Sequence, residues 1–96
     1  MPDYTPSNFG TPVAVAESGS VVTLASAHPT RKGISIYNKS TNNLYISPAV
    51  GVTTSLFMHL IGPGGLYEFP FEYDGALHGI WDGSSHTGAA LVTELK

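Results

Sequence analysis

The sequence contains no cysteine and few charged residues. Without cysteine, the chain can form neither a disulfide bond nor a thiolate metal site. Charged residues make up 11% of its 96 residues and sum to a net charge of −3. Arg31 and Lys32 are its one pair of adjacent basic residues, so it lacks the clustered positive charge of nucleic-acid-binding proteins. We therefore expect no nucleic-acid partner.

Long apolar segments are also absent. No run approaches the ~18 apolar residues of a membrane-spanning helix, so we expect no membrane partner. The first four residues have neither a basic start nor a hydrophobic region, and we expect no signal peptide. A chain of this length forms one domain with a marginal core. Small domains without crosslinks often gain stability by association, which favours a homo-oligomer.

Groups typical of catalytic and metal sites are scattered along the chain. No serine lies in a Gly-x-Ser-x-Gly motif, and no two histidines have the close spacing of zinc ligands. The four histidines are His28, His59, His78 and His86. Glu72, Asp74 and Asp82 come nearest to a calcium-type cluster, but the two aspartates precede glycines and are typical turn residues. We expect no enzyme, no bound metal and no cofactor.

The sequence does contain many short segments rich in β-branched and aromatic residues, separated by Gly, Pro, Asn and Asp. No stretch has the length and periodicity of an amphipathic helix. Turn signals recur about every 8–12 residues, which is typical of a sandwich or small barrel. We predict an all-β domain over residues 13–96: a compact antiparallel sandwich or small barrel of about eight short strands. The predicted strands are 13–16, 21–24, 33–38, 44–46, 55–61, 66–71, 76–81 and 89–95.

Two turns in this pattern predict hairpins. The polar segment 39–43 separates strands 33–38 and 44–46, which favours direct pairing of those two strands. The glycine-rich segment 62–65 is the strongest turn signal, and we interpret it as a hairpin turn because it lacks the helix and lysine of a phosphate-binding loop. Pro70 predicts an edge position or a break in the strand that contains it.

Residues 1–12 differ from the rest of the chain. They hold three prolines and little periodicity, which predicts an extended N-terminal arm. Tyr4 and Phe9 lie in this arm and require an apolar surface. That surface could belong to their own domain or to a neighbouring protein, so we name both as candidate partner-binding residues.

Aromatic residues gather in the window 67–81. Phe69 and Phe71 suit the core, whereas Tyr73 and Trp81 flank turns and each carries a polar group. Tyr73 and Trp81 could therefore lie in the core or partly on the surface, and both are candidate partner-binding residues. Together with nearby acidic turn residues they could also form a stacking surface for a glycan.

A wider pattern of turns and strand edges resembles a known class of proteins. It comprises residues 31–40, 43–46, 63–70, 75–81 and 90–95. This pattern is similar to small β-rich virion structural proteins of tailed bacteriophages, of the capsid decoration (cement) type, and covers nearly all of residues 12–96. The resemblance implies a β-sandwich or barrel, self-assembly, no catalysis, and contacts with the major capsid protein or other virion proteins.

These observations lead to one functional hypothesis and one alternative. We expect a capsid decoration protein that binds and stabilises the head shell, located in the virion after assembly in the host cytoplasm. The proline-rich arm suits this role if it lies across neighbouring subunits. The alternative is a glycan-binding or adaptor module of a phage tail, neck or fibre.

Overall fold

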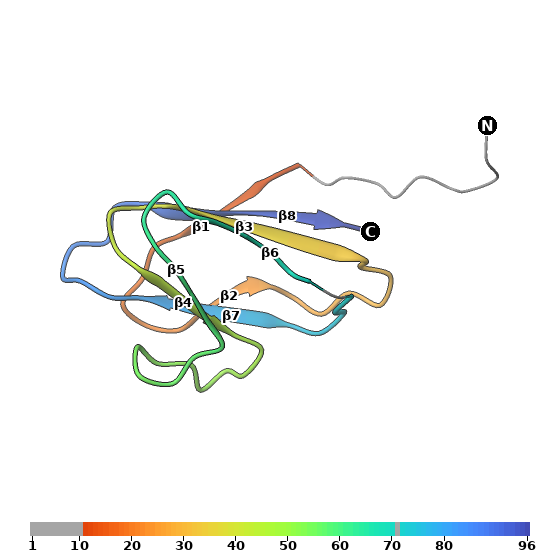
Figure 1. The fold of residues 1–96 in the computed structure, drawn as a ribbon, viewed down its shortest axis with the longest axis horizontal. Helices are drawn as coiled ribbons and strands as arrows, with labels where there is room; N and C mark the ends of the chain where they lie inside the picture. Colours follow the sequence, from red (N-terminus) through yellow and green to blue (C-terminus); the bar gives the residue numbers. More distant parts are fainter. Residues whose placement is uncertain (1–10, 71) are drawn as a thin grey trace.

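The structure of the protein is a computed structural model that describes residues 11–70 and 72–96. The arm residues Tyr4 and Phe9, and the aromatic residue Phe71, lie outside this part of the chain. The described residues form eight β-strands and no helix (Figure 1). The strands are β1 (Val13–Ala16), β2 (Val22–Ala25), β3 (Gly33–Lys39), β4 (Leu44–Ser47), β5 (His59–Ile61), β6 (Leu66–Glu68), β7 (Leu77–Trp81) and β8 (Ala89–Leu95).

The strands form two four-stranded antiparallel sheets packed face to face. Sheet 1 has the order β1-β8-β3-β6, and sheet 2 has the order β2-β7-β4-β5. The first strand therefore pairs with the last, the second with the seventh, the third with the sixth and the fourth with the fifth. This is a long antiparallel hairpin rolled up into two layers, the strand order of a double-sheet jelly roll. The prediction of an all-β antiparallel sandwich is confirmed.

The core lies between the two sheets and follows the alternation of the strands. In β3, Ile34, Ile36 and Asn38 are buried, while Ser35 and Tyr37 between them face outward. In β7, Leu77 and Trp81 point into the core, and Trp81 is its largest fully buried side chain. Because one face of each strand is buried in this way, the register of both sheets is fixed by the apolar pattern.

Both predicted hairpins are wrong. Strand β3 lies in sheet 1 and β4 in sheet 2, so segment 40–43 crosses between the layers instead of turning back. The same holds for β5 and β6, because Gly64, with a φ of 74°, helps the chain pass from sheet 2 to sheet 1. A turn signal marks a change of direction, but it does not determine which strand the chain pairs with next.

Two predicted strands are shorter in the structure. The predicted strand 55–61 is reduced to β5, because Thr53 and Leu56 exchange backbone hydrogen bonds in a tight turn. The predicted strand 66–71 is reduced to β6, an edge strand that ends two residues before Pro70. Proline cannot donate a ladder hydrogen bond, so both the edge position and the break at Pro70 are confirmed.

Candidate docking surface

An exposed apolar surface is formed by the loop 48–58, which connects β4 to β5. Val50 and Leu56 leave 70% and 72% of their surface accessible, and Phe57 and Met58 are also exposed. Leu60 extends the surface onto the edge strand β5. Exposed apolar side chains that gather on one loop mark binding sites more often than isolated ones do. We call this surface the 48–58 patch.

The loop that carries the patch is held by its own hydrogen bonds. The Thr53 hydroxyl oxygen accepts from the backbone N–H groups of Ser55 (3.2 Å) and Leu56 (2.9 Å). The N–H of Met58 donates to the carbonyl of Ile46 in β4 (2.8 Å), which fixes the return of the chain. Within the loop, the side chain of Val52 is buried. A loop ordered before binding loses little conformational entropy when it contacts a partner.

An aromatic pair attaches the patch to the outer face of sheet 2. The Phe57 ring meets the Tyr45 ring edge to face, with a centroid distance of 4.8 Å. The Tyr45 hydroxyl donates to Asp82 Oδ2 (3.1 Å), and Asp82 also accepts from the backbone N–H (2.9 Å) and side chain (3.0 Å) of Asn43. Phe57 therefore rests on a base that hydrogen bonds hold in position.

These contacts shift the pKa values of the two titratable groups in the base. Burial alone would raise the pKa of Asp82, but the hydrogen bonds from Asn43 and Tyr45 outweigh it and hold that pKa below its ordinary value. Burial, and then the neighbouring Asp82 carboxylate, raise the pKa of Tyr45. Asp82 therefore stays ionised, and Tyr45 stays neutral, at neutral pH.

A shallow hollow of about 290 Å³ lies within the patch. Its lining is mostly apolar: Ser47, Ala49, Gly51, Val52, Leu56, Phe57 and Met58. Such a hollow can accept an apolar side chain of a partner, and it presents no charged group to one. The chemistry available here is binding by apolar contact and shape.

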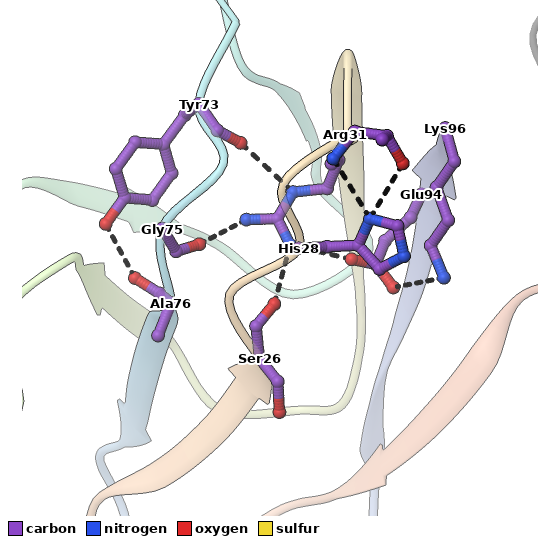
Figure 2. A network of polar contacts seen from close by, with 9 residues as sticks. Ser26, His28, Arg31, Tyr73, Gly75, Ala76, Glu94 and Lys96 are labelled. Atoms are coloured by element: carbon purple, nitrogen blue, oxygen red, sulfur yellow. Dashed lines mark hydrogen bonds and ion pairs between the residues drawn. The ribbon is translucent and has the colours of Figure 1, made fainter.

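Tyr73, one of the predicted partner-binding residues, contributes to an internal network instead (Figure 2). Arg31 has a fully buried side chain, and its guanidinium lies 6.0 Å from the centre of the Tyr73 ring. The Tyr73 hydroxyl donates to the carbonyl of Ala76 (2.8 Å), and its ring stacks on Phe69 at 5.6 Å. Tyr73 is thus half-buried, and its hydroxyl already has a partner.

The same network joins three segments that are distant in the sequence. Arg31 donates to the carbonyls of Ser26 (2.8 Å), Tyr73 (3.1 Å) and Gly75, and it forms an ion pair with Glu94 (2.7 Å). Figure 2 shows its guanidinium between the loop before β3, the loop before β7 and the end of β8. Its role is to hold one end of the sandwich together.

Trp81 cannot contact a partner in the folded protein, which corrects the prediction made for it. Only 1% of its surface is accessible, and its indole N–H donates to Asn38 Oδ1 (3.0 Å) inside the core. Its polar atom is satisfied by a buried amide and not by solvent. The hypothetical glycan surface of Tyr73 and Trp81 is therefore not formed, because one ring is in the core and the other is half-buried elsewhere.

The histidine and acidic side chains that were considered as metal ligands do not gather in one place. Within residues 11–70 and 72–96, no group of three or more such side chains could hold a metal ion. His59 stacks on Tyr67 at 4.0 Å, and the His86 ring lies within hydrogen-bond distance of the Asp82 carbonyl. In the same part of the chain, no helix is long and apolar enough to cross a membrane.

The sequence contained a signal for the 48–58 patch that our interpretation missed. Leu56, Phe57 and Met58 are three consecutive apolar residues, whereas a strand with one buried face alternates apolar and polar positions. We interpreted them as part of a strand, although Thr53 and Ser55 just before them are typical turn residues.

Comparisons with known proteins identify no relative. No family model matches the chain, and no significant match was found among curated proteins or solved structures.

Proposed function

We propose that this chain is a virion structural protein of a tailed bacteriophage that binds the head shell as a capsid decoration protein. The observation that carries the proposal is the 48–58 patch, a preordered and uncharged apolar surface. The sequence resemblance to phage virion proteins supplies the biological context, and the sandwich fold agrees with what that resemblance implies. Fold alone does not determine function, so the proposal depends on the patch and the resemblance together.

The physical demands of shell binding match this surface. A decoration protein makes the same contact many times over a lattice of identical subunits, and each contact must form with little ordering cost. Leu56 and Val50 are the most exposed apolar side chains of the loop, and the hollow beside Leu56 can accept an apolar side chain of a shell subunit. Burying such side chains contributes about 1.5–3 kcal/mol each when they are fully removed from water.

In this proposal, residues 1–12, which the sequence predicts to be an extended arm, would make a second contact. Tyr4 and Phe9 would insert into apolar sites on an adjacent shell subunit once the domain has bound. Because the arm is tethered to a bound domain, its effective concentration near the shell is high, and even a weak contact adds to the affinity.

The proposal can be tested with purified shells that lack the protein. Shells incubated with the wild-type protein should rupture at a higher temperature than bare shells in a light-scattering melt. The Leu56→Asp protein should leave the rupture temperature at the bare-shell value, because a carboxylate on the patch would be desolvated on binding. Val13→Asp, at an exposed valine on the edge of sheet 1, is the matched control and should protect like the wild type.

Two outcomes would contradict the proposal in different ways. Equal rupture temperatures with and without the wild-type protein would reject the decoration role. Full protection by the Leu56→Asp protein would keep that role but reject the 48–58 patch as the shell contact.

A further inference from the structure

The outer face of sheet 1, on the opposite side of the sandwich, carries a row of apolar side chains. Strand register places Ala14 beside Leu91, Leu91 beside Tyr37, and Tyr37 beside Leu66. Each of these side chains points outward, because side chains alternate along a strand and the neighbouring Ile36 and Val92 point into the core. Leu66 leaves 61% of its surface accessible and Tyr37 leaves 37%. The row crosses all four strands of the sheet.

The outward positions of sheet 1 carry two charged residues of opposite sign, one on each side of this row. Lys39 lies two residues beyond Tyr37 on β3, and Glu68 lies two residues beyond Leu66 on β6. Because β3 and β6 are antiparallel, these two steps lead in opposite directions. The charges are about 13 Å apart along the strands, too far for direct contact within one copy. Both are exposed, and neither forms an ion pair with another described residue.

A shallow hollow of about 270 Å³ lies on the Glu68 side of the row. Its floor is low because β3 carries the small residues Gly33 and Ser35 there. The hollow is lined by Gly33, Ile34, Ser35, Leu66, Glu68, Phe69, Thr93 and Leu95. It therefore combines apolar walls with one carboxylate at the rim, which suits a lysine side chain with an apolar stem and a charged end.

We propose that two copies of this chain associate through the outer faces of sheet 1. A two-fold axis lying in the interface along the apolar row brings each row against the same row of the other copy. This axis also places the Lys39 side of each copy over the Glu68 side of the other. Lys39 then lies over Ser35 of the other copy, one strand away from Glu68 of that copy. The apolar stem of Lys39 enters the hollow of the other copy. The contact forms twice, once on each side of the axis.

The second copy is favoured over other occupants because the face is complementary to itself. It carries one positive and one negative charge, placed so that the two-fold operation pairs them, and the hollow lies where the lysine arrives. An unrelated partner would need the same arrangement of charges independently. The inference does not depend on the proposed function, because it concerns only this face and a second copy of it.

The size of the face sets the strength of the expected dimer. Four strands spaced by ~4.8 Å and about five residues of each strand, at ~3.3 Å per residue, give a face of roughly 320 Å² per copy. That is about two fifths of the ~800 Å² per partner that a standard stable interface buries. The dimer should therefore be weak, with a dissociation constant between about 10 µM and 1 mM, and measurements must reach protein concentrations of about 1 mM.

Charge reversal tests the geometry directly. Sedimentation equilibrium of the full chain should show a monomer–dimer equilibrium for the wild type. In Lys39→Glu, two carboxylates would face each other at both contacts, and in Glu68→Lys two ammonium groups would do so. Each variant alone should raise the dissociation constant at least about tenfold. Lys32→Glu is the matched control because Lys32 precedes β3, is exposed and is off the outer face.

Mixing the two reversed proteins gives the decisive result. The Lys39→Glu copy presents carboxylates at positions 39 and 68, and the Glu68→Lys copy presents ammonium groups at the same two positions. Both contacts between them become attractive, so the equimolar mixture should dimerise about as well as the wild type. Fluorescence of Trp81 and circular dichroism confirm that each variant is folded. A monomeric wild type at about 1 mM, a dimer unaffected by either reversal, or a mixture that stays monomeric would each overturn the proposal.

Discussion

Replacement of Arg31 by methionine should weaken the fold more than any change at an exposed residue. Methionine keeps an apolar stem of similar length but removes the charge and all donors of the guanidinium. Three backbone carbonyls, those of Ser26, Tyr73 and Gly75, then lose their donor, and Glu94 loses its ion pair with Arg31 but keeps the one with Lys96. The Arg31 side chain is fully buried, so a methionine there offers these carbonyls no replacement donor, although Ser26 lies at an exposed position where water can replace part of the loss.

The loss in free energy of unfolding caused by Arg31→Met can be bounded from below and from above. Leaving a buried polar group unsatisfied costs about 1–3 kcal/mol, so three fully buried carbonyls would give about 3–9 kcal/mol, and the three contacts of Arg31 are only partly buried. The upper end would remove most of the total stability of about 5–14 kcal/mol that a chain of this length has. The Glu94 side chain is 23% accessible and can be rehydrated, which also lowers the cost. We expect a loss of about 3–5 kcal/mol, the range found when one partner of a buried ion pair is removed.

Urea unfolding monitored by the fluorescence of Trp81 provides the assay. Trp81 is the single tryptophan and is 1% accessible, so its emission should shift to longer wavelength on unfolding. Lys32→Met is the matched control and should change the unfolding free energy by less than about 0.5 kcal/mol, as is usual for exposed sites. Arg31→Lys should fall between them, because an ammonium cannot reach carbonyls on separate loops as a guanidinium does. An Arg31→Met protein within about 0.5 kcal/mol of the wild type would refute the reasoning.

Three further predictions concern stability. The pKa values of Asp82 and Glu17 are held below their ordinary values, so both carboxylates stabilise the fold above about pH 4, and this contribution is lost as the pH falls through their lowered pKa values. Asp82→Asn and Glu17→Gln should therefore flatten the decline of stability between about pH 5 and 2, as measured by urea unfolding. Asn38→Ala should cost about 2–4 kcal/mol in urea unfolding, because this buried amide makes three hydrogen bonds, including one from Trp81. Gly79→Ala should lower the melting temperature, at a cost of about 1–3 kcal/mol, since a Cβ there would lie 2.8 Å from the Leu24 side chain.

The sequence allowed the strands to be predicted better than their partners. Alternation of apolar and polar residues located β3 within about one residue, because a strand with one buried face has that pattern wherever it lies in a sheet. The closing strand β8 also has the predicted bounds. The pairing of β3 with β8 is different, since the two strands lie far apart in the sequence. Nothing local encodes such a contact. Short loops favour hairpins in general, and here the chain changes sheet at the loops after β3 and β5 instead.

The roles of the aromatic side chains were harder to predict for a similar reason. Tyr73 and Trp81 both flank turns and both carry a polar atom, and the sequence does not show where that atom finds a partner. In the fold, Asn38 reaches the Trp81 indole from another sheet, so the tryptophan can be buried at no polar cost. Arg31 was missed as a structural residue because its partners come from three separate segments.

The two proposed surfaces lie on opposite faces of the sandwich, and this arrangement has a consequence for binding. Phe57 of the 48–58 patch packs on Tyr45, on the outer face of sheet 2, whereas Lys39 and Glu68 lie on the outer face of sheet 1. A dimer through sheet 1 would leave both copies of the patch exposed and facing away from each other. Such a dimer could not place both patches on one flat shell surface, so it should add no avidity there and would instead link the protein to a second surface. Lys39→Glu should therefore leave protection of isolated shells unchanged, while Leu56→Asp should leave the monomer–dimer equilibrium unchanged.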